Sequence, residues 1–209
     1  LPDEQKAELQ MQLEEWQDQL GGSFEMSLAA LDQGWDYPAL QRVLQGSVTE
    51  QGAWDDEAPY FAGDLAAIRL RILDRQNRQE EYLHLAEAES QTLLYLTKLT
   101  NLGRIDEAMN AAKTDMTTAE EAFALAQALR EHQHVSEALQ IARAGLTLTG
   151  SEYRIHELAT WTSDLAEGLG DSATALTARI TAFKTKPSFK DYRKIEDLAG
   201  KTWSKVRSD

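Results

Sequence analysis

The sequence contains no cysteine, which excludes disulfides, thiolate nucleophiles and cysteine-ligated zinc within the chain. It also contains no apolar run of about 18 residues, the length that a transmembrane helix needs, so we expect no membrane contact. The start, Leu1-Pro2-Asp3-Glu4, is acidic and lacks the apolar core of a signal peptide. We therefore expect a cytoplasmic protein. The lack of an initiator methionine favours a piece of a longer polypeptide.

Residues that interrupt helices are scarce, since the 209 residues include only 4 prolines and 12 glycines. Alanine, leucine, glutamate and glutamine, which favour helices, dominate the composition. The hydrophobic content of 42% is enough for a continuous core. Together these features predict an ordered all-α protein.

Charge is unevenly distributed along the chain. The formal net charge is −14, but the stretch from Lys184 to the end carries +4, which leaves −18 on the rest. An acidic surface repels phosphates, so nucleic-acid binding is disfavoured over most of the chain. The basic tail could contact phosphates or an acidic peptide, or it could complement the dipole of the last helix as an end cap. It could also pair with the acidic body, within one chain or between copies.

The first part of the chain predicts a helical cap. Residues 4–20 form an amphipathic helix with Leu9, Leu13, Trp16 and Leu20 on one face, and Gly21-Gly22 ends it. We expect Ser23 to cap a second helix that ends near Leu31, and Pro38 to begin a third that ends near Leu44. The pattern then lapses over residues 46–59, a long loop that Trp54 holds in place. We place a boundary here, with a helical cap and loop at 1–58 and the main array at 59–209, in one continuous domain.

The rest of the chain predicts helices joined by short links, which force antiparallel neighbours. We expect a capping threonine at 117 or 118, and capping serines at Ser151 and Ser188. The predicted ranges are 60–75, 78–88, 90–102, 104–115, 117–131, 134–147, 151–168, 171–185 and 188–200.

Five turns occupy equivalent places, each with a helix on either side. They are centred on Gly34, Asn77, Gly103, Gln133 and Gly170. Glycine and asparagine end helices well because they tolerate a left-handed backbone. Five residues after each turn stand Ala39, Tyr82, Ala108, Ala138 and Ala175, and four beyond those stand Val43, Ala86, Ala112, Ala142 and Arg179. Small residues at these places allow two helix axes to approach closely, which predicts an array of antiparallel helical hairpins.

This pattern resembles tetratricopeptide repeats. Leu169-Gly170-Asp171, Ala175, Ala182 and Pro187 are all in the phase of that family, and the resemblance covers about residues 90–187. The resemblance implies a TPR-like α-solenoid whose first helices line a concave face. We therefore expect an all-α, TPR-like array with an N-terminal helical cap.

Three segments are similar to the C-terminal helical region of bacterial SWIM-type zinc-finger proteins. They are residues 82–95, 118–126 and 157–171. Members of that family carry a Cys-x-Cys…Cys-x-His zinc module before this region, and its ligands have no counterpart in a chain without cysteine. The resemblance implies that the chain is the helical part of a larger protein.

No arrangement of reactive side chains stands out, so we expect no enzyme, cofactor or metal site. The chain has no glycine-rich phosphate loop, no Gly-x-Ser-x-Gly and no His-Glu-x-x-His. His132-Gln133-His134 fits a surface turn, or a metal site that would still need further ligands. The carboxylate runs fit exposed helix faces, which lack the unequal environments that acid–base pairs require.

Two sets of residues are candidates for binding a protein or peptide of unknown identity. If the first helix of each hairpin lines a groove, the groove presents Arg71, Asp74, Thr97, Asn101, Gln127, Arg130, Asp164 and Glu167. The second set, an aromatic anchor site, comprises Trp35, Tyr37, Trp54 and Tyr60, although tryptophans also commonly fill gaps between helices. We predict a non-catalytic protein-interaction scaffold. The alternative is a nucleic-acid accessory domain that contacts phosphates through the basic C-terminal helix.

Overall fold

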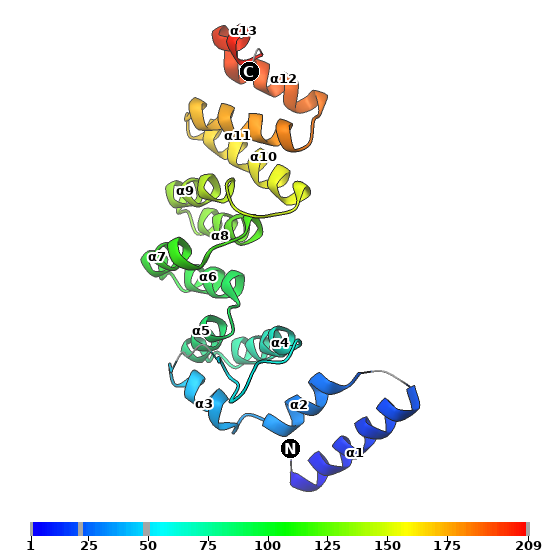
Figure 1. Cartoon of the computed structure of the whole chain (residues 1–209). Helices are drawn as coiled ribbons and strands as arrows, with labels where there is room; N and C mark the ends of the chain where they lie inside the picture. The colour runs from blue at the N-terminus through cyan, green and yellow to red at the C-terminus, as the bar shows by residue number, and fades with distance from the viewer. Residues whose placement is uncertain (1, 21–22, 48–50, 208–209) are drawn as a thin grey trace. The chain divides into compact units, whose positions relative to one another are not determined.

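The protein is all-helical in the computed structural model, which describes residues 2–20, 23–47 and 51–207 (Figure 1). Those residues contain no β-strand, and an isolated bridge joins Thr118 and Thr149. The predicted fold class is therefore confirmed at the level of all-α. No helix in the described ranges has both the length and the apolar character to cross a bilayer. The predicted stop at Gly21-Gly22 lies outside the described residues.

The chain divides into two compact units, Leu1–Gln91 and Thr92–Asp209. The division thus falls after α5, whereas the sequence analysis placed its boundary after residue 58. The reason is that the long loop before α4 returns to the end of α5. The Glu89 carboxylate accepts from the Ala53 backbone N–H at 2.6 Å and from the Trp54 indole at 3.4 Å. These bonds join the loop to the first unit.

The first unit contains five helices in the described residues. They are α1 (Asp3–Leu20), α2 (Glu25–Gln33), α3 (Pro38–Leu44), α4 (Ala62–Arg75) and α5 (Gln79–Ala88). Helix α1 packs on α2, α2 on α4, α3 on α5, and α4 on α5. Leu40, Leu70, Leu73 and Leu85 are fully buried and supply much of the core of this unit. A buried polar contact joins α4 to α2, because Arg69 donates to Gln33 Oε1 at 2.7 Å.

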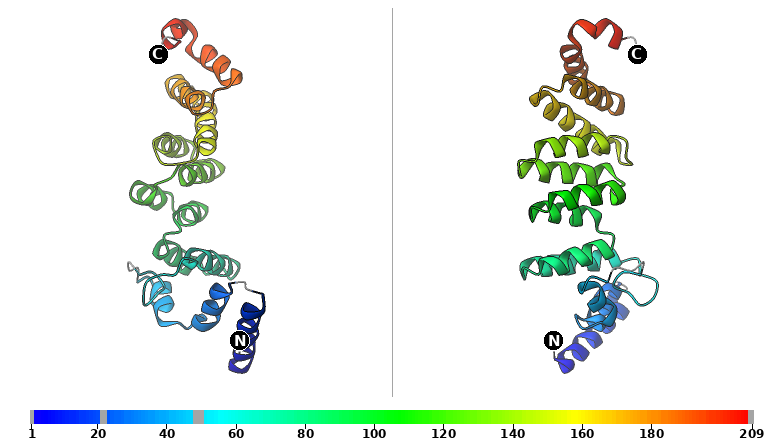
Figure 2. Two further views of the ribbon diagram at one scale, coloured as in Figure 1. Left: turned by 45° about the vertical axis from the view of Figure 1, so that its right-hand side comes forward. Right: turned by 90° about the vertical axis from the view of Figure 1, so that its left-hand side faces the viewer.

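The second unit contains α6 (Thr92–Asn101), α7 (Ile105–Asp115), α8 (Ala119–Glu131), α9 (Val135–Gly145), α10 (Glu152–Gly168), α11 (Ser172–Thr185), α12 (Phe189–Ala199), a 3-10 turn (Gly200–Thr202) and α13 (Trp203–Val206). Each of α6, α8 and α10 packs on the helix that follows it. Helix α8 also contacts both α6 and α10, so these three helices form a row (Figure 2). The sequence analysis did not predict α13.

Four of the aligned turns share one hydrogen-bond pattern. The residue after the turn centre donates its backbone N–H to the carbonyl five residues earlier, as in Arg78 to Leu73, Arg104 to Leu99, His134 to Leu129 and Asp171 to Ala166, at 2.8 to 3.0 Å. This is the Schellman ending of a helix, and it needs a left-handed residue at the centre. The centres Asn77, Gly103, Gln133 and Gly170 have φ of 58°, 76°, 69° and 79°. The fifth turn, at Gly34, also has a positive φ, but its N–H bonds to Ala30 four residues back.

The small residues after these turns are buried, as the sequence predicted. Ala39, Ala108, Ala138 and Ala175 are 0% exposed, and Tyr82 takes the same place at 8%. The positions four residues further on are also buried, and Arg179 is the one charged residue among them. The alanines bring each helix close to its neighbour.

The predicted helix starts are confirmed at three positions. Thr118 and Glu121 form a reciprocal capping box. The side chains of Ser151 and Ser188 each accept from the backbone N–H of the residue three positions later. The prediction for Ser23 is wrong, because α2 begins after Phe24 and has no side-chain cap. The Phe24 N–H donates instead to Gln17 Oε1 of α1, which ties α2 to the helix before it.

Candidate functional site

The eight predicted groove residues divide between the two units. Arg71 and Asp74 lie exposed on α4 in the first unit, and the other six lie on α6, α8 and α10 in the second. Five of those six are exposed. Thr97 is half-buried and donates its hydroxyl to the carbonyl of Leu93 in its own helix at 2.7 Å, so this hydroxyl is already used. The row α6, α8 and α10 therefore presents five of the predicted polar side chains to solvent.

The most structured part of this row is a cation over an indole. The Arg130 guanidinium carbon lies 5.3 Å from the ring centre of Trp161, which joins the end of α8 to the middle of α10. Trp161 also makes an edge-to-face contact with Phe123, with ring centres 5.7 Å apart. Cations over indoles are stabilised by the negative face of the ring. This pair holds the long Arg130 side chain in one place on an exposed surface.

A cavity of 430 Å³ opens beside this pair. Its walls include the apolar side chains Val135, Trp161, Leu165 and Leu169, together with the polar Arg130 and Asp164. Leu169, directly after α10, is 49% exposed and extends this apolar wall to the surface. The sequence analysis found Arg130 and Asp164 but missed Trp161, Leu165 and Leu169. The spacing of three between Trp161 and Asp164 places both on one helix face and was the available signal.

The predicted groove acids are tied to cations. Asp164 accepts from Arg179 of α11, and Glu167 pairs with Lys194 of α12 at 2.6 Å. Both carboxylates are more than two-fifths exposed, so each pair still reaches solvent. The acids on α10 therefore connect the row to the next two helices as well as facing outward.

Arg179 is the centre of a buried polar network that the sequence analysis did not predict. Its guanidinium donates to Asp191 Oδ1 of α12 at 3.0 Å and to Ser163 Oγ of α10 at 3.2 Å. The second carboxylate oxygen, Asp191 Oδ2, accepts from the Ser188 hydroxyl at 2.5 Å. His156 Nε2 lies 3.2 Å from the same Oδ2 atom. Burial raises the pKa of Asp191, but the hydrogen bonds from Ser188, His156 and Arg179 outweigh it, so the pKa is lowered. The network joins α10 of the row to α11 and α12.

The aromatic anchor candidates are distributed over several contacts in the first unit. Trp35 lies under Arg78, whose guanidinium carbon is 5.3 Å from the ring centre. Trp54 and Tyr60 each make an edge contact with Phe61, at 6.3 and 5.2 Å. Tyr60 is 81% exposed, and it is therefore the most accessible of the four.

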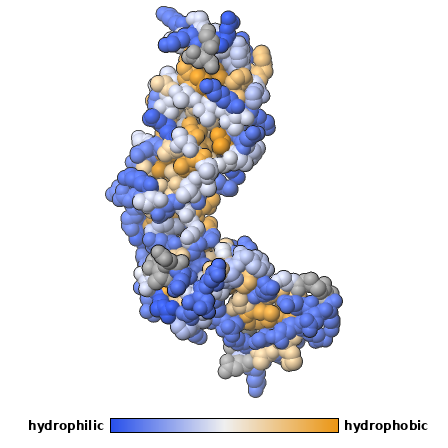
Figure 3. Space-filling model, in the orientation of Figure 1, coloured by the Kyte–Doolittle hydropathy of each residue, from blue (hydrophilic) through white to orange (hydrophobic). Residues whose placement is uncertain are grey.

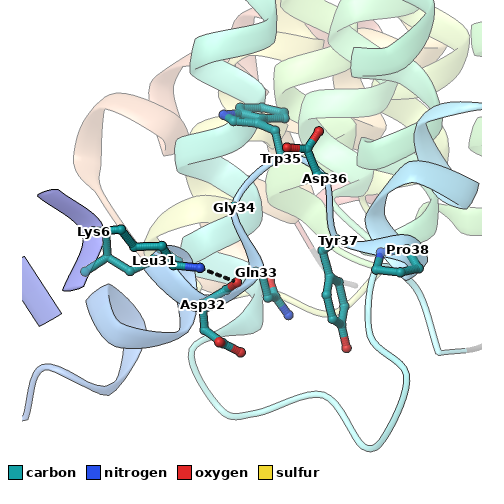
Figure 4. A pocket seen from close by; sticks show the side chains of 10 residues that line it. Lys6, Leu31, Asp32, Gln33, Gly34, Trp35, Asp36, Tyr37 and Pro38 are labelled. Atoms are coloured by element: carbon teal, nitrogen blue, oxygen red, sulfur yellow. Dashed lines mark hydrogen bonds between the residues drawn. The ribbon is translucent and has the colours of Figure 1, made fainter. Parts of the chain in front are cut away.

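Tyr37 and Trp35 lie on the two sides of the turn between α2 and α3. Figure 4 shows their rings pointing in opposite directions beside a cavity of 690 Å³. Lys6 of α1 closes one side of this cavity by donating to the Asp32 carbonyl at 3.1 Å. A hydrogen bond to Asp55 raises the pKa of Tyr37, and Arg42 in turn lowers the pKa of Asp55. Tyr37 is thus bonded to the long loop through Asp55. The structure does not gather the four rings into one cluster.

The basic tail is partly neutralised within the second unit. Lys194 pairs with Glu167, and Arg193 pairs with Glu196 at 2.8 Å. The remaining cations of the tail are all exposed: Lys184, Lys186, Lys190, Lys201, Lys205 and Arg207.

His132, from the His-Gln-His turn, lies 3.1 Å from Asn101 Oδ1 and so connects α8 to α6. Among the described residues, no three His, Asp or Glu side chains are grouped so as to hold a metal ion.

Comparisons with protein-family models, with curated proteins and with solved structures give no match. Nothing in them links the chain to SWIM-type zinc-finger proteins, and that resemblance stays a prediction from sequence.

Proposed function

We propose that the second unit is a TPR-like array of helical hairpins and acts as a non-catalytic scaffold that binds a segment of another protein. The shared Schellman turns, the buried alanines that follow them and the row α6, α8 and α10 support the TPR-like arrangement. In such arrays the first helix of each hairpin lines the binding face. On this proposal the chain is the interaction region of a larger protein, as the SWIM-type resemblance implies.

The observation that carries the proposed function is the cavity beside Arg130 and Trp161. It combines a fixed cation, an indole and exposed Leu169 on the row that the turn pattern marks as the binding face. Tryptophan and arginine in a desolvated pocket are the side chains most often responsible for binding energy at protein interfaces. We expect the bound segment to insert one apolar side chain here and to place polar groups along α8 and α10.

Site-specific crosslinking tests this proposal. A photoreactive benzoylphenylalanine at Gln127, exposed on α8, should capture a discrete partner in cells that express the protein. The matched position is Gln140, exposed on α9, which should capture none above background. Leu169→Asp should abolish the Gln127 crosslink while circular dichroism and thermal unfolding stay unchanged, because Leu169 is half exposed.

Two outcomes would contradict the scaffold. One is an equal yield of crosslinks from Gln127 and Gln140. The other is DNA binding that weakens steeply with salt and disappears when the exposed lysines of the tail are changed to glutamine, which would favour the nucleic-acid alternative.

A further inference from the structure

A second cleft lies at the C-terminal end of the second unit, apart from the Arg130–Trp161 cavity. It has a volume of 410 Å³ between α11, α12 and α13, and its apolar walls are Ile180, Phe183, Tyr192, Ile195, Trp203 and Val206. Tyr192 is the central ring, in edge contact with Trp203 at 5.1 Å and tilted against Phe183 at 6.2 Å. In Figure 3 apolar surface flanked by hydrophilic surface is visible at the end where Figure 1 draws these helices.

The charged side chains that line this cleft are of one sign. Among the described residues that line it, the charged ones are Lys184 and Arg207, both cations and both exposed. Lys201 and Lys205 are exposed in the same segment. An occupant that complements this cleft therefore has one apolar side chain for the aromatic floor and carboxylates around it for the rim.

Helix α1 presents a surface of that kind. Met11 is 65% exposed, and at 3.6 residues per turn Glu8, Glu15 and Asp18 all lie within about 60° of it around the helix. Each of these three carboxylates is exposed. The opposite face of α1 is the one that packs within the first unit, through buried Leu13 and the contact of Trp16 with Phe24 at 6.5 Å.

We propose that the acidic face of α1 docks in the C-terminal cleft of a second copy of this chain. Met11 enters the aromatic cleft, where an unbranched thioether adapts to irregular space and makes favourable sulfur–aromatic contacts. Glu8 and Glu15 face Lys184 and Arg207 of the other copy. The contact joins two different surfaces, so a bound pair still has one free α1 face and one free cleft. Association therefore proceeds head to tail. One helix on one cleft is a small interface, so the association is weak and sensitive to salt.

Sedimentation velocity over a concentration series tests this inference. The whole chain should form dimers and larger species as its concentration rises at low ionic strength, and should return toward the 23.4 kDa monomer in 0.5 M salt. Met11→Asp changes the helix, and the double change Lys184→Glu with Arg207→Glu changes the cleft. Each should weaken self-association by about tenfold or more. Gln12→Asp makes the same charge change as Met11→Asp at an exposed neighbour, and Lys190→Glu with Lys186→Glu makes the same charge change as the double cleft variant. Both controls should leave self-association unchanged.

Mixing the two defective proteins distinguishes a contact between copies from one within a chain. The Met11→Asp protein keeps an intact cleft, and the Lys184→Glu/Arg207→Glu protein keeps an intact helix, so the mixture should form a heterodimer that grows no further. A wild-type chain that stays monomeric, variants that associate like wild type, or a mixture that sediments as two monomers would each overturn the inference. The Gln127 crosslink tests a different surface, so either proposal can fail alone.

Discussion

Arg179 and Asp191 form an ion pair that is almost completely buried. Arg179 Nη1 lies 3.0 Å from Asp191 Oδ1, and the two side chains are 3% and 5% exposed. The pair joins α11 to α12 at a turn-following position where the other hairpins have alanine or valine. Burying two charges costs free energy. The bond that Arg179 donates to Ser163 and the contacts of Asp191 with Ser188 and His156 offset that cost.

Removing one charge of this pair should be strongly destabilising. Asp191→Asn removes the buried carboxylate of the pair and leaves Arg179 with the exposed carboxylate of Asp164, and we expect a loss of about 3 kcal/mol in the free energy of unfolding. Asp197→Asn, on the exposed face of the same helix, should change it by less than about 0.5 kcal/mol. Urea unfolding followed by circular dichroism measures both. Equal stability of the two variants would show that the pair contributes nothing.

The same pair should give the protein a specific sensitivity to acid. The folded protein holds the pKa of Asp191 below its ordinary value, so the unfolded chain takes up a proton first as the pH falls. The stability that this carboxylate contributes is therefore complete at neutral pH and is lost below about pH 4. We expect the difference in unfolding free energy between wild type and Asp191→Asn to narrow from pH 7 to pH 3. A constant difference over that range would contradict the lowered pKa.

Gly145 of α9 lies close to side chains of both α8 and α10. A Cβ built there would overlap the Cβ of Ala122 and lie 2.9 Å from Leu158 Cδ2, on α8 and α10. Alanine normally stabilises a helix by about 1 kcal/mol relative to glycine, but here overpacking should cost about 1 to 3 kcal/mol. Gly145→Ala should therefore lower the melting temperature. Gly168→Ala is the control, because open space surrounds Gly168, and it should leave the melting temperature unchanged or raise it.

The turn at Gln133 carries a residue that its backbone does not favour. Gln133 has φ of 69° in the same Schellman turn where two of the other hairpins have glycine. Gln133→Gly should raise the unfolding free energy by about 1 kcal/mol, because glycine adopts this conformation without a steric penalty. Gln140→Gly, at an exposed position inside α9, should lower it by about 1 kcal/mol. Calorimetry should show shifts in melting temperature of opposite sign, and shifts of the same sign would contradict the left-handed turn.

Sequence alone determined the approximate ranges of helices α1 to α12 and the five aligned turns. The periodic apolar residues, Thr118 with Glu121, and the aligned glycines and alanines all act within one or two helical turns, so local spacing is enough to reveal them. The positions after the turns proved to be buried, including Arg179, because a helix can approach its neighbour only on that face. The same phase placed the polar residues Gln127 and Arg130 on one helix, α8, where both are exposed.

Tertiary structure decided which distant side chains meet. Asp191 finds Arg179 and His156, Glu89 holds the loop at Ala53, and Arg130 covers Trp161, across separations that no local pattern encodes. The same is true of the division after Gln91 and of the cleft around Tyr192. Helix formation follows from neighbouring residues and backbone hydrogen bonds. The direction of each charged or aromatic side chain instead depends on which helix lies opposite it, and that is fixed only when the helices pack.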